Sequence, residues 1–212
     1  MDTKDIDRKI AVIFATDAVG YSKHMEKDEN QTIQSFEACN EILEKLLKKY
    51  GGTVFNTAGD SVLAEFPSAV AAVECGSDFQ KEIKKRNASI DTSVKLEFRI
   101  GINMGDVVKK SGNLLGDGVN IAARLEALSQ SNGISISKSV FDLVSNKTNL
   151  SFNDLGVQKV KDNEFHAFDV LLDPSQKRKL KTKSNVLLFT TIAVVLIIGL
   201  AGIVYYNSKV QV

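Results

Sequence analysis

Two aspartates in this 212-residue chain each lie next to apolar runs, and together they could hold a divalent cation. Asp17 ends the run "KIAVIFATD", which is typical of a central β-strand whose far end opens onto a site. Asp60 lies at the tip of "VFNTAGDSVLAEF", where two apolar runs meet at a turn that begins with Gly59. Taken alone, Asp60 could be a turn residue only. Two carboxylates at the same end of neighbouring strands, however, repel each other unless a cation lies between them.

Two further features have the chemistry of a phosphate site. Gly20, in the stretch "AVGYS" after Asp17, allows backbone amides at a helix start to approach an anion closely. Phosphate oxygens commonly complete the coordination shell of a Mg²⁺ ion held by carboxylates. The two aspartates and the backbone at Gly20 together therefore predict a magnesium triphosphate site. Asn120 and Arg124 are four residues apart in a predicted helix and share a polar face. In isolation, Arg124 could be a solvated surface charge and Asn120 the polar edge of the helix.

The elements that must position these residues follow an α+β pattern. Helical spacing predicts helices over 31–50, 68–87 and 116–129, and alternation predicts a strand over 95–108. A short helix at 138–145 and strands within 134–137, 150–160 and 166–172 complete the pattern. The order of strand, helix, two strands, helix and strand predicts a ferredoxin-like antiparallel sheet with helices on one face. In that sheet the first strand lies beside the hairpin, which would bring Asp17 to Asp60.

Composition indicates one core and an appendage. The chain is 43% hydrophobic, and Pro174 ends the last predicted strand region. We expect an N-terminal tail at 1–7, a catalytic domain at 8–173, a basic linker at 174–185, a transmembrane helix at 186–206 and a short tail at 207–212. The apolar segment 186–206 would rise ~31 Å as a helix, which matches a bilayer core. A buried core helix is the alternative for this segment.

The charges around the apolar segment predict its orientation. Five cationic residues precede it, whereas only Lys209 follows it, so the domain is expected on the cytoplasmic side of the inner membrane, anchored by a single span. These five are Lys177, Arg178, Lys179, Lys181 and Lys183. Without them the chain has 22 basic and 26 acidic residues, which argues against a nucleic-acid-binding surface.

Four ordered motifs carry a family resemblance. The stretches "FATDAVGYS", "NTAGDSVLAEFPS", "FRIGINMGDVV" and "LLGDGVNIAARLEAL" resemble the catalytic domain of class III nucleotidyl cyclases, in particular the bacterial adenylate-type branch. The resemblance covers roughly residues 8–172. It implies a membrane-anchored enzyme that converts ATP to cyclic AMP and pyrophosphate. A catalytically silent nucleotide-binding or dimerisation module is the alternative.

The resemblance implies a role for each candidate residue. Asp17, Asp60 and the backbone carbonyl of Ala18 match the ligands of two Mg²⁺ or Mn²⁺ ions. Asn120 matches the residue that positions the ribose, and Arg124 matches the one that stabilises charge on the α-phosphate. The family pairs two copies head to tail, so a homodimer with shared sites is expected.

Four other residues would contact the substrate. Gly20 lies where the phosphates would approach, and Lys161 falls where the family usually has a lysine for the terminal phosphates. Asn56 and Asn113 match the base-binding positions, where adenylate cyclases commonly have a lysine and an aspartate or threonine. An asparagine both donates and accepts, so neither position selects a purine by its charge. ATP is the favoured substrate, and GTP or a pyrimidine nucleotide is the alternative.

Overall fold

The fold is that of a computed structural model, which describes residues 7–160, 163–173, 175, 177 and 178. The first of its two compact units ends at Arg178, and the second, 179–212, lies outside the described residues. Both Lys161 and the predicted transmembrane segment 186–206 also lie outside them. Within the described ranges, no helix is long and apolar enough to cross a membrane.

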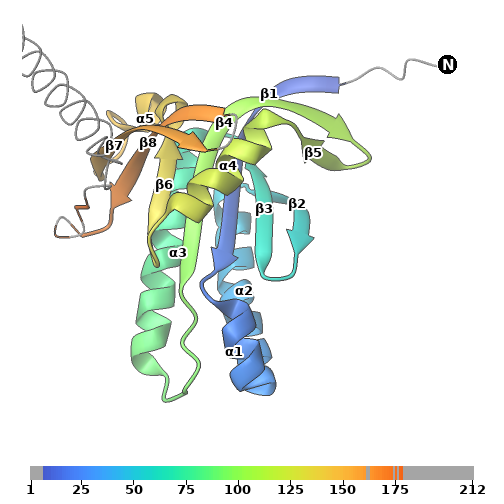
Figure 1. The fold of residues 1–212 in the computed structure, drawn as a ribbon, viewed down its shortest axis with the longest axis vertical. Coiled ribbons are helices and arrows are strands. Elements are labelled where there is room, and N and C mark those ends of the chain that lie inside the picture. The colour runs from blue at the N-terminus through green and yellow to red at the C-terminus, as the bar shows by residue number, and fades with distance from the viewer. Residues whose placement is uncertain (1–6, 161–162, 174, 176, 179–212) are drawn as a thin grey trace, which may run out of the picture. The chain divides into compact units, whose positions relative to one another are not determined.

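Eight strands form one mixed β-sheet (Figure 1). They are β1 (Asp7–Ala18), β2 (Thr53–Ala58), β3 (Ser61–Phe66), β4 (Phe98–Lys110), β5 (Asn113–Leu115), β6 (Ile134–Ser137), β7 (Ser151–Val160) and β8 (Asn163–Leu171). The order across the sheet is β2, β3, β1, β4, β6, β8, β7, and β5 pairs with β4. The predicted α+β class is confirmed. A wholly antiparallel sheet is wrong, because β4 and β6 pair in parallel after a crossover that contains a helix.

Helices cover both faces of the sheet, whereas one covered face was predicted. They are α1 (Tyr21–Lys27), α2 (Glu29–Tyr50), α3 (Ala69–Ser89), α4 (Asp117–Leu128) and α5 (Lys138–Val144). Phe14 of β1 packs in one core cluster with residues of α2 and α3, and Ile13 of β1 packs in another with Ala122 of α4. Figure 1 shows α4 in front of the strands and α2 and α3 behind them. A strand that is apolar on both sides requires cover on both sides, so the continuous run in β1 explains the second helical layer.

Local chemistry fixes the ends of the two long helices. Asp28 accepts a hydrogen bond from the amide of Gln31 and caps α2, and Ser68 accepts one from the amide of Ala71 and caps α3. Gly51 ends α2 in the left-handed conformation, with φ of 76°. These caps place the hairpin of β2 and β3 directly after α2.

Helix α4 lies unusually close to β4 at Gly101. A Cβ atom built at Gly101 would lie 2.1 Å from the amide nitrogen of Glu126 and 2.2 Å from the carbonyl oxygen of Ala122. At the other end of the helix, the side-chain amide of Asn103 donates to the carbonyl of Gly118 at 2.9 Å. The absence of a side chain at position 101 therefore sets the height of α4 above the sheet.

We predict that Gly101→Ala lowers the free energy of unfolding by about 3 kcal/mol, because the methyl group would overlap the α4 backbone. Chemical denaturation with urea measures the change. Gly76→Ala in α3 is the matched control, since its new Cβ would make ordinary contacts of 3.4 Å with Ile134 and Phe14. The control should be neutral or gain up to about 1 kcal/mol from helix propensity. Equal stability of the Gly101→Ala variant and the natural chain would contradict this account of the helix height.

Candidate active site

The end of β1 and the tip of the β2–β3 hairpin meet at one edge of the sheet (Figure 1). The backbone amide of Ala18 donates to the Asp60 carboxylate, with 3.2 Å between nitrogen and Oδ2. Gly59 takes a φ of 61°, and this left-handed turn brings Asp60 back toward β1. The structure thus brings together Asp17, Ala18 and Asp60, as the sequence predicted.

The electrostatics of this pair suit a bound cation. Burial and the neighbouring Asp17 charge raise the pKa of the Asp60 carboxyl above its ordinary value. The described residues contain no group of three or more His, Cys, Asp or Glu side chains that could hold a metal. A hard divalent cation bound by one or two carboxylates takes its remaining ligands from water, backbone carbonyls and substrate phosphate. The residues present therefore fit Mg²⁺ or Mn²⁺ that arrives with a phosphate substrate.

Arg99 and Glu126 extend this charged cluster, and the sequence analysis missed both. Arg99 is the antiparallel partner of Asp17, and its Nη2 lies 3.0 Å from Asp17 Oδ2. Its Nε lies 2.9 Å from Glu126 Oε1 on α4, an ionic contact whose angles do not make a hydrogen bond. The alternation of "EFRIGIN" places Arg99 on the polar face of β4. Only the register with β1 shows that this face lies beside Asp17.

Glu126 is an unusual carboxyl, with a side chain only 13% exposed. Burial raises its pKa to about 7, the Arg99 charge opposes this shift, and the Asp17 and Asp60 charges add to it. The sequence alone does not show how closely α4 approaches the sheet, so it gives no sign that Glu126 is buried. Glu126 and Arg99 therefore connect the aspartate pair to α4.

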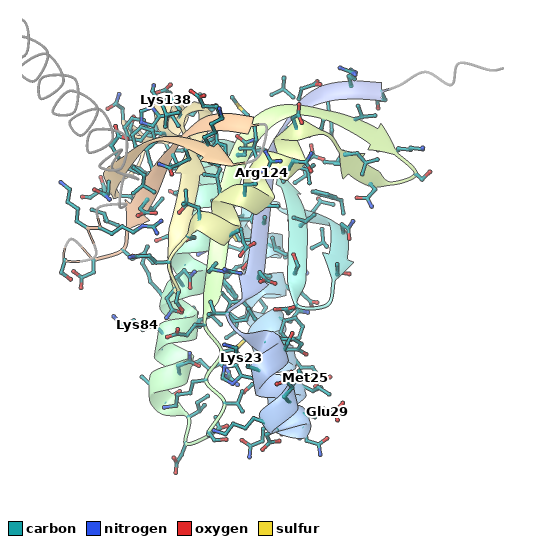
Figure 2. The ribbon with its side chains drawn as sticks, in the orientation of Figure 1. Lys23, Met25, Glu29, Lys84, Arg124 and Lys138 are labelled. Atoms are coloured by element: carbon teal, nitrogen blue, oxygen red, sulfur yellow. The ribbon has the colours of Figure 1, made fainter. Side chains whose placement is uncertain are left out.

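Helix α4 also carries Asn120 and Arg124, which contact neither aspartate by any recorded hydrogen bond or ion pair of the described residues. Asn120 is exposed and Arg124 is half-buried. Figure 2 shows Arg124 on α4, in front of the sheet. Its Nη1 atom is buried and has no hydrogen-bond partner among the described residues. A buried guanidinium nitrogen without a partner is costly, and because this atom is closed to solvent, the Arg124 side chain would have to move before a group outside the chain could reach it.

The two candidate base-binding residues approach each other from separate strands. Asn56 of β2 and Asn113 at the start of β5 are 57 positions apart, yet Asn56 Nδ2 lies 3.5 Å from Asn113 Oδ1. Asn113 Oδ1 also accepts the amide of Leu114 at 3.0 Å. A bulge in β2 between Val54 and Asn56 turns the Asn56 side chain in this direction. The two side-chain amides therefore lie together, as expected if both contact the same base.

The remaining phosphate candidate, Gly20, precedes α1. Its φ is 66°, and its carbonyl accepts the amides of Lys23 and His24 at 3.0 and 3.2 Å. Apart from its chain neighbours, no atom of the described residues lies within 4 Å of a Cβ built there, so this side of the backbone is open. Lys161, the other phosphate candidate, lies outside the described residues.

Comparisons with known proteins bear on the same elements. Residues 3–170 match the family model described as the adenylate and guanylate cyclase catalytic domain. The "Putative adenylate cyclase 3" of Rhizobium meliloti (strain 1021) is 41% identical over 165 residues, 77% of this chain and 28% of that protein. An adenylate cyclase of Streptomyces coelicolor is 28% identical over 137 residues, 63% of this chain and 33% of that protein. The chain thus spans about a third or less of these two curated relatives.

Solved structures share the fold. The crystal structure of an adenylate/guanylate cyclase/hydrolase from Silicibacter pomeroyi superposes with a TM-score of 0.74 at 33% identity, over 80% of this chain and all of that one. The adenylyl cyclase CyaB from P. aeruginosa superposes with a TM-score of 0.68 at 27% identity, over 83% of this chain and 99% of that one.

We predict that Glu126 makes stability fall as pH rises. A carboxyl whose pKa is raised to about 7 on folding, from 4.5, stabilises the fold below pH 4.5 and loses that contribution as pH rises through 7. Between pH 5 and 8, the free energy of unfolding of the natural chain should fall by about 2 to 3 kcal/mol more than that of Glu126→Gln. Urea unfolding with a metal chelator present measures both curves. Glu82→Gln, at an exposed position of α3, is the control and should follow the natural chain, and parallel curves for Glu126→Gln and the natural chain would disprove the assignment.

Proposed function

Because this chain belongs to the family of adenylate and guanylate cyclase catalytic domains, we propose that it converts ATP to 3′,5′-cyclic AMP and pyrophosphate. The observation that carries the proposal is the meeting of Asp17 and Asp60, joined through the amide of Ala18 at 3.2 Å. Curated relatives named as adenylate cyclases support ATP as the substrate.

The reaction exchanges a phosphoanhydride bond for a phosphoester bond. The ribose 3′-hydroxyl loses its proton to solvent and its oxygen forms a bond to the α-phosphorus, the bond from that phosphorus to the oxygen bridging the β-phosphate breaks, and pyrophosphate leaves. Two Mg²⁺ or Mn²⁺ ions, when bound, supply activation of the 3′-hydroxyl and neutralisation of phosphate charge. Asp17, Asp60 and the Ala18 carbonyl would hold them. The backbone at Gly20 would approach the phosphates.

Two residues of α4 would act on the α-phosphate and the ribose of the substrate. Arg124 would stabilise the charge that develops on the α-phosphate, since a guanidinium aimed at that position acts most strongly in the transition state. Asn120 would hold the ribose so that its 3′-oxygen faces the phosphorus. Lys161 is assigned to the terminal phosphates from the sequence motif alone.

We propose that two copies of the chain share these tasks in a symmetric homodimer. Among the described residues, neither Asn120 nor Arg124 makes a hydrogen bond or ion pair with Asp17 or Asp60, which supports a site whose second half comes from another copy. In a head-to-tail pair, the aspartates of one copy would face the asparagine and arginine of the other. Each chain has one full set of both halves, so a symmetric pair would contain two sites.

The base would lie at Asn56 and Asn113. Their side chains approach within 3.5 Å and offer both donors and acceptors. This pair does not select adenine by charge, so GTP or a pyrimidine triphosphate is the alternative substrate.

The membrane anchor is also a proposal. The uncharged run 186–206 follows a cluster of basic residues, a pattern that supports a single span with the catalytic domain in the cytoplasm. Such a tether would concentrate the chains in one plane and favour their pairing.

The test uses alkali-washed membranes from cells that express the full chain. Cyclase activity of these membranes is measured with Mn²⁺ and each of the four nucleoside triphosphates in turn. We expect cyclic AMP from ATP at the highest rate, and at least a hundredfold loss with Asp60→Ala or Arg124→Ala. Asn56→Lys combined with Asn113→Asp should raise the preference for ATP over GTP.

The outcomes separate the parts of the proposal. No cyclic product from any nucleotide would identify a silent binding module. A different preferred nucleotide would overturn only the choice of base. Activity that alkali releases from the membrane would overturn only the anchor, and Glu82→Gln should match the natural chain throughout.

A further inference from the structure

Arg178 makes a buried ion pair with the catalytic domain, although the sequence placed it in the basic linker. Its Nε donates to Asp169 Oδ2 at 2.7 Å and its Nη2 donates to Asp169 Oδ1 at 3.0 Å. The two side chains are only 16% and 9% exposed. Two parallel charge-assisted bonds give this contact a fixed geometry. Arg178 therefore belongs to the folded domain and differs from its exposed neighbour Lys177.

The pair is tied to two further strands. Asp169 of β8 accepts the hydroxyl of Ser135 in β6 at 2.8 Å, so the carboxylate has a second fixed partner. The side-chain amide of Asn153 in β7 donates to the main-chain carbonyl of Arg178 at 2.8 Å. Both the side chain and the backbone at position 178 are thus held against the sheet.

Arg178 also contacts the end of α4. Its Nη2 donates to the carbonyl of Leu128, the last residue of that helix, at 2.9 Å. The last carbonyls of a helix have no partner within it and carry partial negative charge, so a cation there is stabilising. Leu128 follows Arg124 by four residues, which is about one turn. The guanidinium of Arg178 therefore lies about one helical turn from the proposed catalytic arginine.

We propose that Arg178 is a positioning residue, which holds the C-terminal end of α4 on the sheet and thereby sets the place of Arg124. This inference rests on the role proposed for Arg124.

An ion pair that only stabilises the fold could be replaced by apolar side chains without loss of kcat. Replacement of a buried pair by apolar side chains of similar volume commonly preserves stability, whereas removal of one partner does not. Arg178→Met together with Asp169→Leu should therefore melt closer to the natural chain than Arg178→Met alone, because it leaves no unpaired buried charge, although the buried Ser135 hydroxyl loses its acceptor. The double variant nevertheless lacks the donor to the Leu128 carbonyl, so the end of α4 is released.

The experiment measures kcat and KM of full-length variants below their melting temperatures, per folded molecule. In the double variant and in Arg178→Met, kcat should fall about tenfold or more while KM for ATP stays the same, because Arg124 acts on the transition state. Arg178→Lys, which keeps the charge but not the paired bonds, should lose part of kcat. Lys177→Met, the matched control, should match the natural chain in both constants.

The kinetic constants of these variants either support or overturn the positioning role of Arg178. Natural kcat in both the double variant and Arg178→Lys, or a change confined to KM, would overturn the positioning role. If the double variant does not fold, the kcat of Arg178→Lys against that of Lys177→Met decides alone. Arg124→Ala separates this inference from the proposed function: if that variant stays active, the role of Arg124 itself fails, and if it is inactive while the Arg178 variants are normal, only the positioning role fails.

Discussion

The close approach of α4 to β4 at Gly101 is the constraint on which the candidate site depends. Only a residue without a side chain leaves room for the α4 backbone at this point. The helix then lies near enough for Glu126 to reach Arg99, which in turn reaches Asp17. The same helix carries Asn120, which is exposed, and Arg124, which is half-buried. This one backbone contact thus sets the position of α4, with Asn120 and Arg124, relative to the aspartates of the same chain.

The balance of charge at the sheet edge follows from this packing. Arg99 lies between the Asp17 carboxylate and Glu126, and it is 29% exposed. Without a metal, this guanidinium is the positive charge nearest to Asp17 in the contacts of the described residues. A divalent cation with bound phosphate would compete for Asp17 and leave Arg99 beside incoming negative charge. In the proposed function, this edge would receive a cation and an anion together, as a metal nucleotide would supply them.

Sequence reasoning reached the residues whose spacing is local or whose motif is distinctive. The helix over 31–50, the alternating strand of "FRIGIN" and the meeting of Asp17 with Asp60 follow from periodicity and from the predicted neighbouring strands. The other features depend on contacts between residues that are far apart in the sequence. The parallel pairing of β4 and β6, the second helical layer and the burial of Glu126 depend on how α4 crosses the sheet. Arg178 read as a linker charge because only the fold places Asp169 and the Leu128 carbonyl beside it.

In the proposed homodimer, two copies of this chain complete each other's sites, and mixing two inactive variants distinguishes this arrangement from sites built within one chain. Asp60→Ala removes a metal ligand and Arg124→Ala removes the charge that acts on the α-phosphate, so each variant alone should be inactive. In a mixed dimer, one copy supplies intact aspartates and the other an intact arginine, which restores one site of two. Random pairing makes about half of the dimers mixed, so activity should recover to about one quarter of the natural value. Activity indistinguishable from zero, with mixed dimers shown to form by differently tagged chains, would mean that each site is built within a single chain.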